Sequence, residues 1–155
     1  MTAKSIIIHC SATKDSGTVS TSAIRHYHKE VMGWSDIGYH FLVELCNEND
    51  YEVLIGRPWD QEGAHCYGHN KNSLGICIIG DFDIQAPPEG QWKKSVDFVA
   101  FLCYYFGIPV DYIYGHRHFD SHKTCPGKAF DMDRFRNDVK IELKKKVCVI
   151  KEDEV

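Results

Sequence analysis

The chain has 155 residues, 43% of them hydrophobic and 26% charged, which is typical of one globular domain and excludes a disordered or fibrous chain. Its formal net charge of −4 provides no general basic field, so we expect no nucleic-acid partner. The seven cysteines are odd in number and scattered, which argues against a disulfide framework and favours folding in a reducing compartment.

The first element predicted is a buried strand over Ser5–His9, because its apolar residues are continuous and β-branched. Ile6-Ile7-Ile8 is too short for the core of a signal peptide, and no stretch of the chain approaches a membrane span. We therefore expect the protein to be made in the cytoplasm without a signal peptide. It would act outside the cell only after release or export by another system.

A helix is predicted next, capped by Ser20 or Thr21 and running to about Met32, with Ile24, Tyr27 and Val31 on its inner face. His26 and His28 lie on this helix and are interpreted as solvent or boundary residues. After it, residues 39–45 and 51–55 are separated by a polar turn and predict a β-hairpin.

Residues 63–73 have no periodicity and are rich in Gly, His and Asn. Such a loop, which carries His65, His69 and Asn70, is typical of the border of a binding groove, although an ordinary polar connector has the same composition. The apolar residues 74–80 that follow predict a fully buried strand.

The strongest helix begins after Pro88 and ends at Gly107, and its apolar residues recur at steps of four and three, which predicts a core-facing stripe. A strand over residues 110–115 and a last helix from about Asp131 complete the order. We therefore expect an α/β fold: a single domain with a central mixed β-sheet flanked by helices. The predicted boundaries are a catalytic domain over residues 1–146 and a charged tail over 147–155.

Residues 116–125 combine three histidines, a lysine and a cysteine directly after the predicted strand. Together with His9, either His116 or His118 and Cys125 would make a set of two imidazoles and one thiolate. Three protein ligands leave a fourth position open, as in catalytic zinc sites, where the metal lowers the pKa of a bound water to about 7.

Several motifs, in the same order along the chain, resemble those of the type 2 N-acetylmuramoyl-L-alanine amidases, a family that includes phage lysozyme-like amidases and peptidoglycan recognition proteins. The resemblance runs from about Ser5 to Phe135 and rests on these segments: Ile7-Ile8-His9-Cys10-Ser11-Ala12-Thr13, Gly33-Trp34-Ser35-Asp36-Ile37-Gly38-Tyr39-His40-Phe41, Gly63-Ala64-His65, Gly68-His69-Asn70, Ser73-Leu74-Gly75-Ile76, Gly115-His116-Arg117 and Cys125-Pro126-Gly127.

The resemblance implies a zinc enzyme that hydrolyses the amide bond between N-acetylmuramic acid and L-alanine in bacterial peptidoglycan, with one Zn²⁺ per chain. It implies that the metal ligands are His9, His116 and Cys125. Tyr39 and Lys123 correspond to catalytic residues that hold the developing oxyanion. It gives less guidance on the substrate contacts, which we assign to His65, His69 and Asn70.

One segment departs from the family pattern. The family commonly has an acidic residue two positions after the ligand histidine, where this chain has His118, and the cysteine eight positions after it, whereas Cys125 is nine positions after His116. His116 and His118 would point to the same side of an extended chain, so either could be the ligand. We prefer His116 because it follows Gly115 as in the family, and His118 or Asp120 could then be an outer-shell partner.

Three other functions have to be separated from the amidase. A peptidoglycan-binding module without metal would lack the cysteine ligand, a cysteine hydrolase would use Cys125 as its nucleophile, and a structural zinc site would need a fourth protein ligand. We expect a monomer whose partner is the peptidoglycan substrate, with no membrane partner and no separate wall-binding domain.

Overall fold

The protein is an α/β domain whose elements follow the predicted order of strand, helix, three strands, helix, strand and helix. The computed structural model describes residues 1–14, 19–48 and 50–153, with side chains as far as residue 147. The elements are β1 (Ser5–Cys10), α1 (Thr21–His26), β2 (Phe41–Asn47), β3 (Asp50–Ile55), β4 (Ser73–Ile78), α2 (Glu89–Phe106), β5 (Ile113–Gly115) and α3 (Met132–Asp153).

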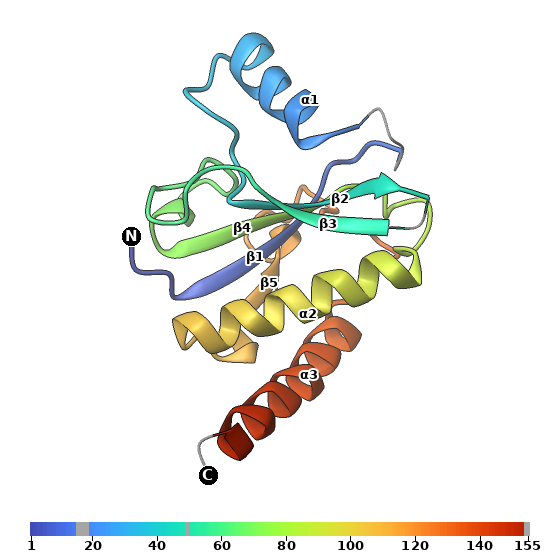
Figure 1. Ribbon diagram of the computed structural model, residues 1–155. Coiled ribbons are helices and arrows are strands. Elements are labelled where there is room, and N and C mark those ends of the chain that lie inside the picture. Colours follow the sequence, from blue (N-terminus) through green and yellow to red (C-terminus); the bar gives the residue numbers. More distant parts are fainter. Residues whose placement is uncertain (15–18, 49, 154–155) are drawn as a thin grey trace.

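The five strands form one mixed sheet in the order β3-β2-β4-β1-β5 (Figure 1). β1 pairs in parallel with both β4 and β5, and β2 pairs in parallel with β4. The predicted hairpin is confirmed, since β3 runs antiparallel to β2 along one edge. The predicted fold class, a mixed sheet in a single domain, is therefore confirmed.

One face of the sheet is covered by α2, against which α3 packs, and holds the larger core (Figure 1). Ile6 and Ile8 of β1 point into this core, because alternate residues of a strand face the same side. The predicted stripe of α2 packs here: Trp92, Val96, Val99 and Cys103 are buried and Phe106 is partly buried. The helix ends at Gly107, whose φ of 65° is the left-handed conformation that favours glycine.

The opposite face lies toward α1 and has a smaller apolar cluster that includes Ile37, Leu42 and Cys77. The prediction for the inner face of the first helix is wrong, since Tyr27 and Val31 are 52% and 64% exposed while His28 is buried. The face turned toward the sheet is instead made by Thr21, Ile24 and His28, which are three and four residues apart. Residues 27–31 form a π-helix, whose wider turn rotates Val31 further from that face.

The C-terminal part of the chain differs from the sequence prediction at one strand. The predicted strand over residues 110–115 is a 3₁₀-helix at Val110–Tyr112 followed by the short strand β5. The predicted tail, residues 147–155, is helical as far as Asp153, and residues 154 and 155 lie outside the described part.

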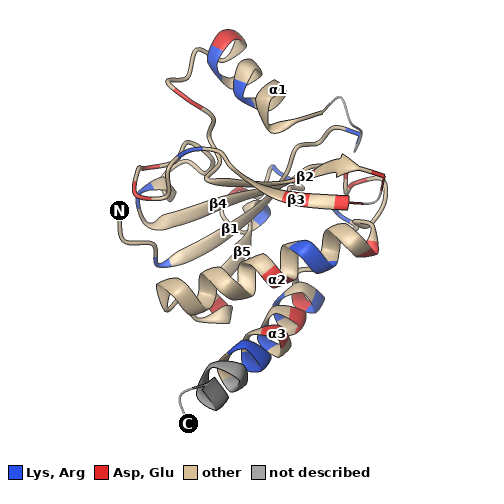
Figure 2. Ribbon diagram, in the orientation of Figure 1, with Lys and Arg blue, Asp and Glu red and all other residues tan. Residues whose placement is uncertain are grey.

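Charges of both signs alternate along α3 (Figure 2), where Lys145 and Lys146 pair with Glu142 one turn away. Among the helices within the described ranges, none combines the length and the apolar character needed to cross a membrane.

Candidate active site

Two of the predicted metal ligands lie where neighbouring parallel strands end. His9 is the next-to-last residue of β1, and His116 directly follows the last residue of β5. Ligand sites of open α/β sheets form at the carboxyl ends of parallel strands. Pairing of β1 with β5 therefore places the two imidazoles side by side, with ring centroids 4.6 Å apart.

Arg117 connects the third predicted ligand to this edge. Its backbone N–H donates to the carbonyl of Cys125 at 2.7 Å. Its guanidinium donates to the carbonyls of Gly127 and Phe130, beyond the cysteine. One arginine thus holds both sides of the cysteine loop next to His116.

A second anchor of the same loop is Asp83. Its carboxylate accepts the hydroxyl of Thr124 at 2.6 Å and the backbone N–H of Lys128 at 2.8 Å. These two hydrogen bonds lower the pKa of Asp83, so the carboxylate is ionised at neutral pH. Residues on either side of Cys125 are therefore attached to the body of the domain.

The three side chains brought together in this way can hold a metal ion. One donor atom from each of His9, His116 and Cys125 lies within 4.8 Å of the others. Nδ1 of His9 is 3.7 Å from Sγ of Cys125. A tetrahedral zinc ion with Zn–N of about 2.05 Å and Zn–S of about 2.3 Å would separate these atoms by about 3.6 Å. The donor set and its spacing therefore fit zinc.

Burial shifts the pKa of all three groups, and for Cys125 a hydrogen bond contributes more. Burial lowers the pKa of His9 well below the usual histidine range, with the nearby charges of His65 and His116 adding to the effect. It also lowers the pKa of His116. The hydrogen bond with the Cys10 side chain, followed by burial, raises the pKa of Cys125. Both imidazoles are therefore neutral, and the thiol keeps its proton unless a cation replaces it.

The structure distinguishes between the two histidines that the sequence left open. The segment His116–His118 is a 3₁₀-helix, so the extended chain assumed for it is wrong and the two side chains diverge. The exposed His118 ring stacks on Tyr114, with centroids 4.7 Å apart. The group with His9 and Cys125 is made by His116. Asp120, the other suggested outer-shell partner, accepts the backbone N–H of His122.

Tyr39 lies against the same group, with its ring centroid 5.2 Å from that of His9. Burial raises the pKa of Tyr39 well above the usual tyrosine range, and the Cys77, Cys125 and Cys10 thiols contribute further. The phenol is therefore protonated at neutral pH and is available as a hydrogen-bond donor.

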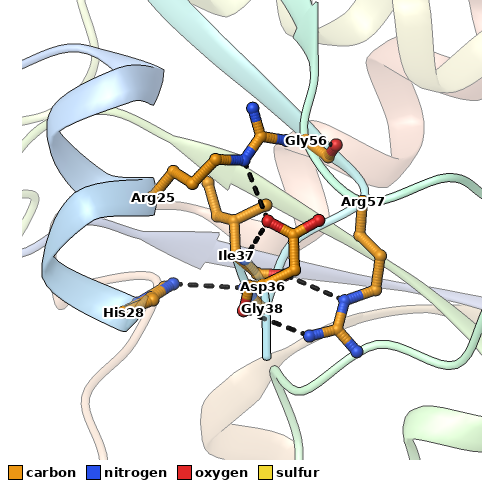
Figure 3. Close-up of polar contacts among 7 residues, drawn as sticks. All are labelled: Arg25, His28, Asp36, Ile37, Gly38, Gly56 and Arg57. Carbon is orange, nitrogen blue, oxygen red and sulfur yellow. Dashed lines mark hydrogen bonds and ion pairs between the residues drawn. The ribbon is translucent and has the colours of Figure 1, made fainter. Parts of the chain in front are cut away.

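The segment before Tyr39 is held by a polar network between α1 and the end of β3 (Figure 3). The Arg57 side chain donates to the carbonyls of Ile37 and Asp36, at 2.9 and 3.2 Å. Nδ1 of His28 accepts the backbone N–H of Gly38 at 3.1 Å.

The Asp36 carboxylate in turn accepts Nε of Arg25 at 2.9 Å and the N–H of Ile37 at 2.7 Å. The second nitrogen of Arg25 reaches the carbonyl of Gly56. The network thus fixes the three residues that precede Tyr39 on several sides at once (Figure 3).

Next to the metal-ligand group is a pocket of about 400 Å³, which His116, Lys123, Asp120 and Trp34 help to line. Lys123 is exposed, and its positive charge contributes to the lowered pKa of His116. An ammonium group therefore borders the pocket close to the candidate ligands.

The three residues predicted to contact substrate, His65, His69 and Asn70, lie in three different environments. His65 is buried, and its Nδ1 is 3.1 Å from Nε2 of His9. Burial lowers the pKa of His65 to about 3, with the charge of His40 adding to this effect. Oδ1 of Asn70 accepts the backbone N–H groups of His65 and Cys66, both at 2.8 Å. The His69 ring lies against the Phe119 ring in a tilted arrangement, with centroids 4.0 Å apart.

Two residues of the Tyr39 network were missed from the sequence. From the sequence, His28 is interpreted as a solvent or boundary residue and Arg57 is assigned no role. A signal for His28 existed, since it is four residues after Ile24 and so shares its helical face. No comparable pattern marks Arg57, whose partners are backbone carbonyls.

Comparison with known proteins agrees with this geometry. The family described as N-acetylmuramoyl-L-alanine amidase matches residues 1–128. The endolysin of Enterobacteria phage K11 is 41% identical over 131 residues, covering 83% of this chain and 82% of the endolysin. The endolysin of Klebsiella phage KP32 is 35% identical over 133 residues, covering 84% of this chain and 83% of the endolysin.

A solved structure of the N-acetylmuramoyl-L-alanine amidase LysC from Clostridium intestinale has the same fold. It superposes with a TM-score of 0.78 over 90% of this chain and 86% of LysC, at 24% identity. The chain therefore belongs to the N-acetylmuramoyl-L-alanine amidase family and is an enzyme that hydrolyses an amide bond of peptidoglycan.

Proposed function

We propose that the protein is a zinc-dependent enzyme that cuts the amide bond between N-acetylmuramic acid and L-alanine. The observation that carries this proposal is the convergence of one donor atom each from His9, His116 and Cys125 within 4.8 Å, beside a pocket. One zinc ion per chain, held by these three residues, would supply Lewis acidity that acidifies water and polarises a carbonyl oxygen.

Tyr39 and Lys123 are proposed to stabilise the transition state. Hydrolysis of an amide places negative charge on the carbonyl oxygen, and preorganised donors near that oxygen lower the barrier. Tyr39 supplies a phenol whose raised pKa keeps its proton in place. Lys123 supplies an ammonium group at the edge of the pocket. Neither role requires contact with the metal.

The loop that carries His65, His69 and Asn70 is proposed to contact the glycan or the peptide, because the pocket is lined by His65 and Asn70. Of the three, His65 is turned toward His9. We further propose that the catalytic domain spans residues 1–146, that the enzyme acts as a monomer, and that it reaches the wall by release or export through another system.

The geometry also bears on the alternative of a cysteine hydrolase. A nucleophilic cysteine needs a lowered pKa and a base that accepts its proton. Here the pKa of Cys125 is raised and that of the adjacent His9 is lowered, which is the reverse of an activated thiolate–imidazolium pair. This supports the role of Cys125 as a metal ligand.

Cys125→Ser tests the proposal, because serine is a much poorer zinc ligand than thiolate. The matched control is Cys46→Ser, which changes an exposed free cysteine on β2. Zinc content, release of muropeptides from purified peptidoglycan and pull-down on insoluble peptidoglycan are measured for both variants and the wild type.

We expect Cys125→Ser to lose zinc and hydrolysis while keeping its binding to peptidoglycan, and Cys46→Ser to behave as wild type. A wild-type activity that resists a chelator would instead indicate a nucleophilic cysteine. A serine variant that unfolds would indicate a structural metal site. Full hydrolysis by Cys125→Ser would refute the proposed role.

A further inference from the structure

Behind His9, on the side away from Cys125, a chain of buried hydrogen bonds runs into the sheet. Nε2 of His9 is 3.1 Å from Nδ1 of His65, and Nε2 of His65 is 3.4 Å from the hydroxyl oxygen of Ser73. The Ser73 hydroxyl donates to the backbone carbonyl of His69 at 2.6 Å. Both histidines and Ser73 are buried.

The backbone carbonyl at the end of this chain fixes the direction of every proton in it. A carbonyl oxygen can only accept, so the Ser73 hydroxyl proton points to His69, as the short distance also requires. The Ser73 oxygen then offers only lone pairs to His65. Nε2 of His65 is therefore its protonated nitrogen, and Nδ1 of His65 is an acceptor.

The same reasoning fixes His9. Since Nδ1 of His65 accepts, Nε2 of His9 carries the proton and donates it. The unprotonated Nδ1 of His9 is then the nitrogen that lies 3.7 Å from Cys125 Sγ, on the side of the proposed metal. The opposite proton order would put the proton on Nδ1 of His9. The Ser73 hydroxyl would then donate to His65, and its oxygen would face the carbonyl oxygen of His69, which also can only accept.

The sheet is shaped to accept the His65 ring. A Cβ at Gly75 of β4 would collide with Cγ, Cδ2 and Nδ1 of that ring, and a Cβ at Gly63 would collide with its Cδ2. The ring therefore lies directly against the backbone of β4 at Gly75, where any larger residue would collide with it. The backbone N–H groups of residues 65 and 66 are also held by Asn70.

We propose that His65 is a positioning residue that orients His9 and fixes its Nε2–H tautomer for binding metal through Nδ1. This inference rests on the proposed function, in which His9 is a zinc ligand. Ligand histidines in metal sites commonly donate their second ring N–H to an acceptor, and loss of that acceptor typically reduces metal affinity 10–100-fold. Here the acceptor is a neutral imidazole, itself oriented by Ser73.

The first test is the tautomeric state of the histidines in the metal-free wild type, read from the ¹⁵N shifts of the ring nitrogens. We expect Nε2–H for both His9 and His65. His40 provides an internal reference, because its Nδ1 accepts the Gly75 N–H at 2.9 Å and its Nε2 faces the carbonyl of Gln61 at 3.0 Å. Protonation of His9 at Nδ1 would overturn the proposal, whatever happens to the variants.

The second test compares zinc affinity in two variants. His65→Leu fills the site without an acceptor, whereas the side-chain oxygen of His65→Asn is as many bonds from the backbone as Nδ1 and can accept from His9. Competition with a chromophoric chelator should show about a 10–100-fold weaker affinity for His65→Leu and recovery of most of that loss in His65→Asn. Zinc binding by His65→Leu as tight as wild type, or equal losses in both variants, would overturn the proposal.

The two proposals can fail separately. If the wild type binds no zinc but His9 and His65 show Nε2–H, the proposed function fails and the proton order stands. If the wild type binds zinc and His9 is protonated at Nδ1, the positioning role fails and the zinc site stands.

Discussion

Replacing Arg57 by lysine tests whether the network before Tyr39 is needed for stability and for catalysis. Arg57 is 9% exposed and donates to three backbone carbonyls, those of Ile37, Glu62 and Asp36, at 2.9, 2.6 and 3.2 Å. Lysine keeps the charge, but its single ammonium group does not match the fork of a guanidinium. At least two carbonyls would lose their partner.

Hydrogen bonds to a charged group contribute about 1.5–3 kcal/mol each, so the loss of two lowers the free energy of unfolding by about 3 kcal/mol or more. For a chain of this size, 1 kcal/mol shifts Tm by about 2–4 °C, so Tm should fall by about 6–12 °C. Because Tyr39 follows the released segment, a displacement of about 1 Å could cost up to about a hundredfold in kcat.

Thermal unfolding and muropeptide release measure the two effects. Arg134→Lys is the control, because Arg134 is an exposed arginine whose ion pairs with Glu89 and Asp138 are solvated. Its guanidinium also lies over the Trp92 ring, 4.6 Å from the centroid, where lysine keeps the positive charge, so the cost should stay near or below about 1 kcal/mol. If Arg57→Lys melts within about 2 °C of the wild type and keeps its kcat, the network does not position Tyr39 and the reasoning is wrong.

Two further predictions concern catalysis and pH. Tyr39→Phe and Lys123→Ala should each lower kcat by about a hundredfold or more, with zinc content unchanged, and loss of zinc from either variant would show a misassigned role. In the metal-free protein, stability should fall as pH drops below about 6.5, where the unfolded chain protonates His65 while the folded protein, with a pKa of about 3, does not. Urea unfolding should show a loss of about 3 kcal/mol at pH 4.5 from this residue, and His65→Asn, which cannot titrate, should remove that part of the pH dependence.

Periodicity was sufficient to predict most of the fold, because the larger core is built from regular elements. The stripe from Trp92 to Phe106 and the buried strand before Gly80 are local patterns, and both are confirmed. The prediction was wrong at Tyr27 and Val31, because the helix turns a neighbouring stripe toward the sheet, the one made by Thr21, Ile24 and His28. Local spacing allows either stripe, and the choice depends on Trp34 and Gly38, which His28 contacts only after the chain has turned.

The candidate site could be predicted only in part, for a related reason. Histidines and a cysteine at strand and loop ends are visible in a sequence, and they indicated His9 and Cys125. The choice between His116 and His118 depends on a single 3₁₀ turn, which rotates the second ring onto Tyr114. An assumed extended chain could not separate them.

The position of His65 shows why metal ligands are easier to predict than the residues behind them. A ligand is restricted by its own chemistry to a few residue types, so composition and spacing carry information about it. A residue that orients the ligand can be any group able to accept a hydrogen bond, and its identity is set by packing. Here that packing depends on β4 lying beside β1 with glycine at position 75, so that the His65 ring fits against the strand and reaches Nε2 of His9. The Gly75 that appeared in the sequence as part of a family motif therefore has a specific physical role: it leaves the space in which the proposed ligand is oriented.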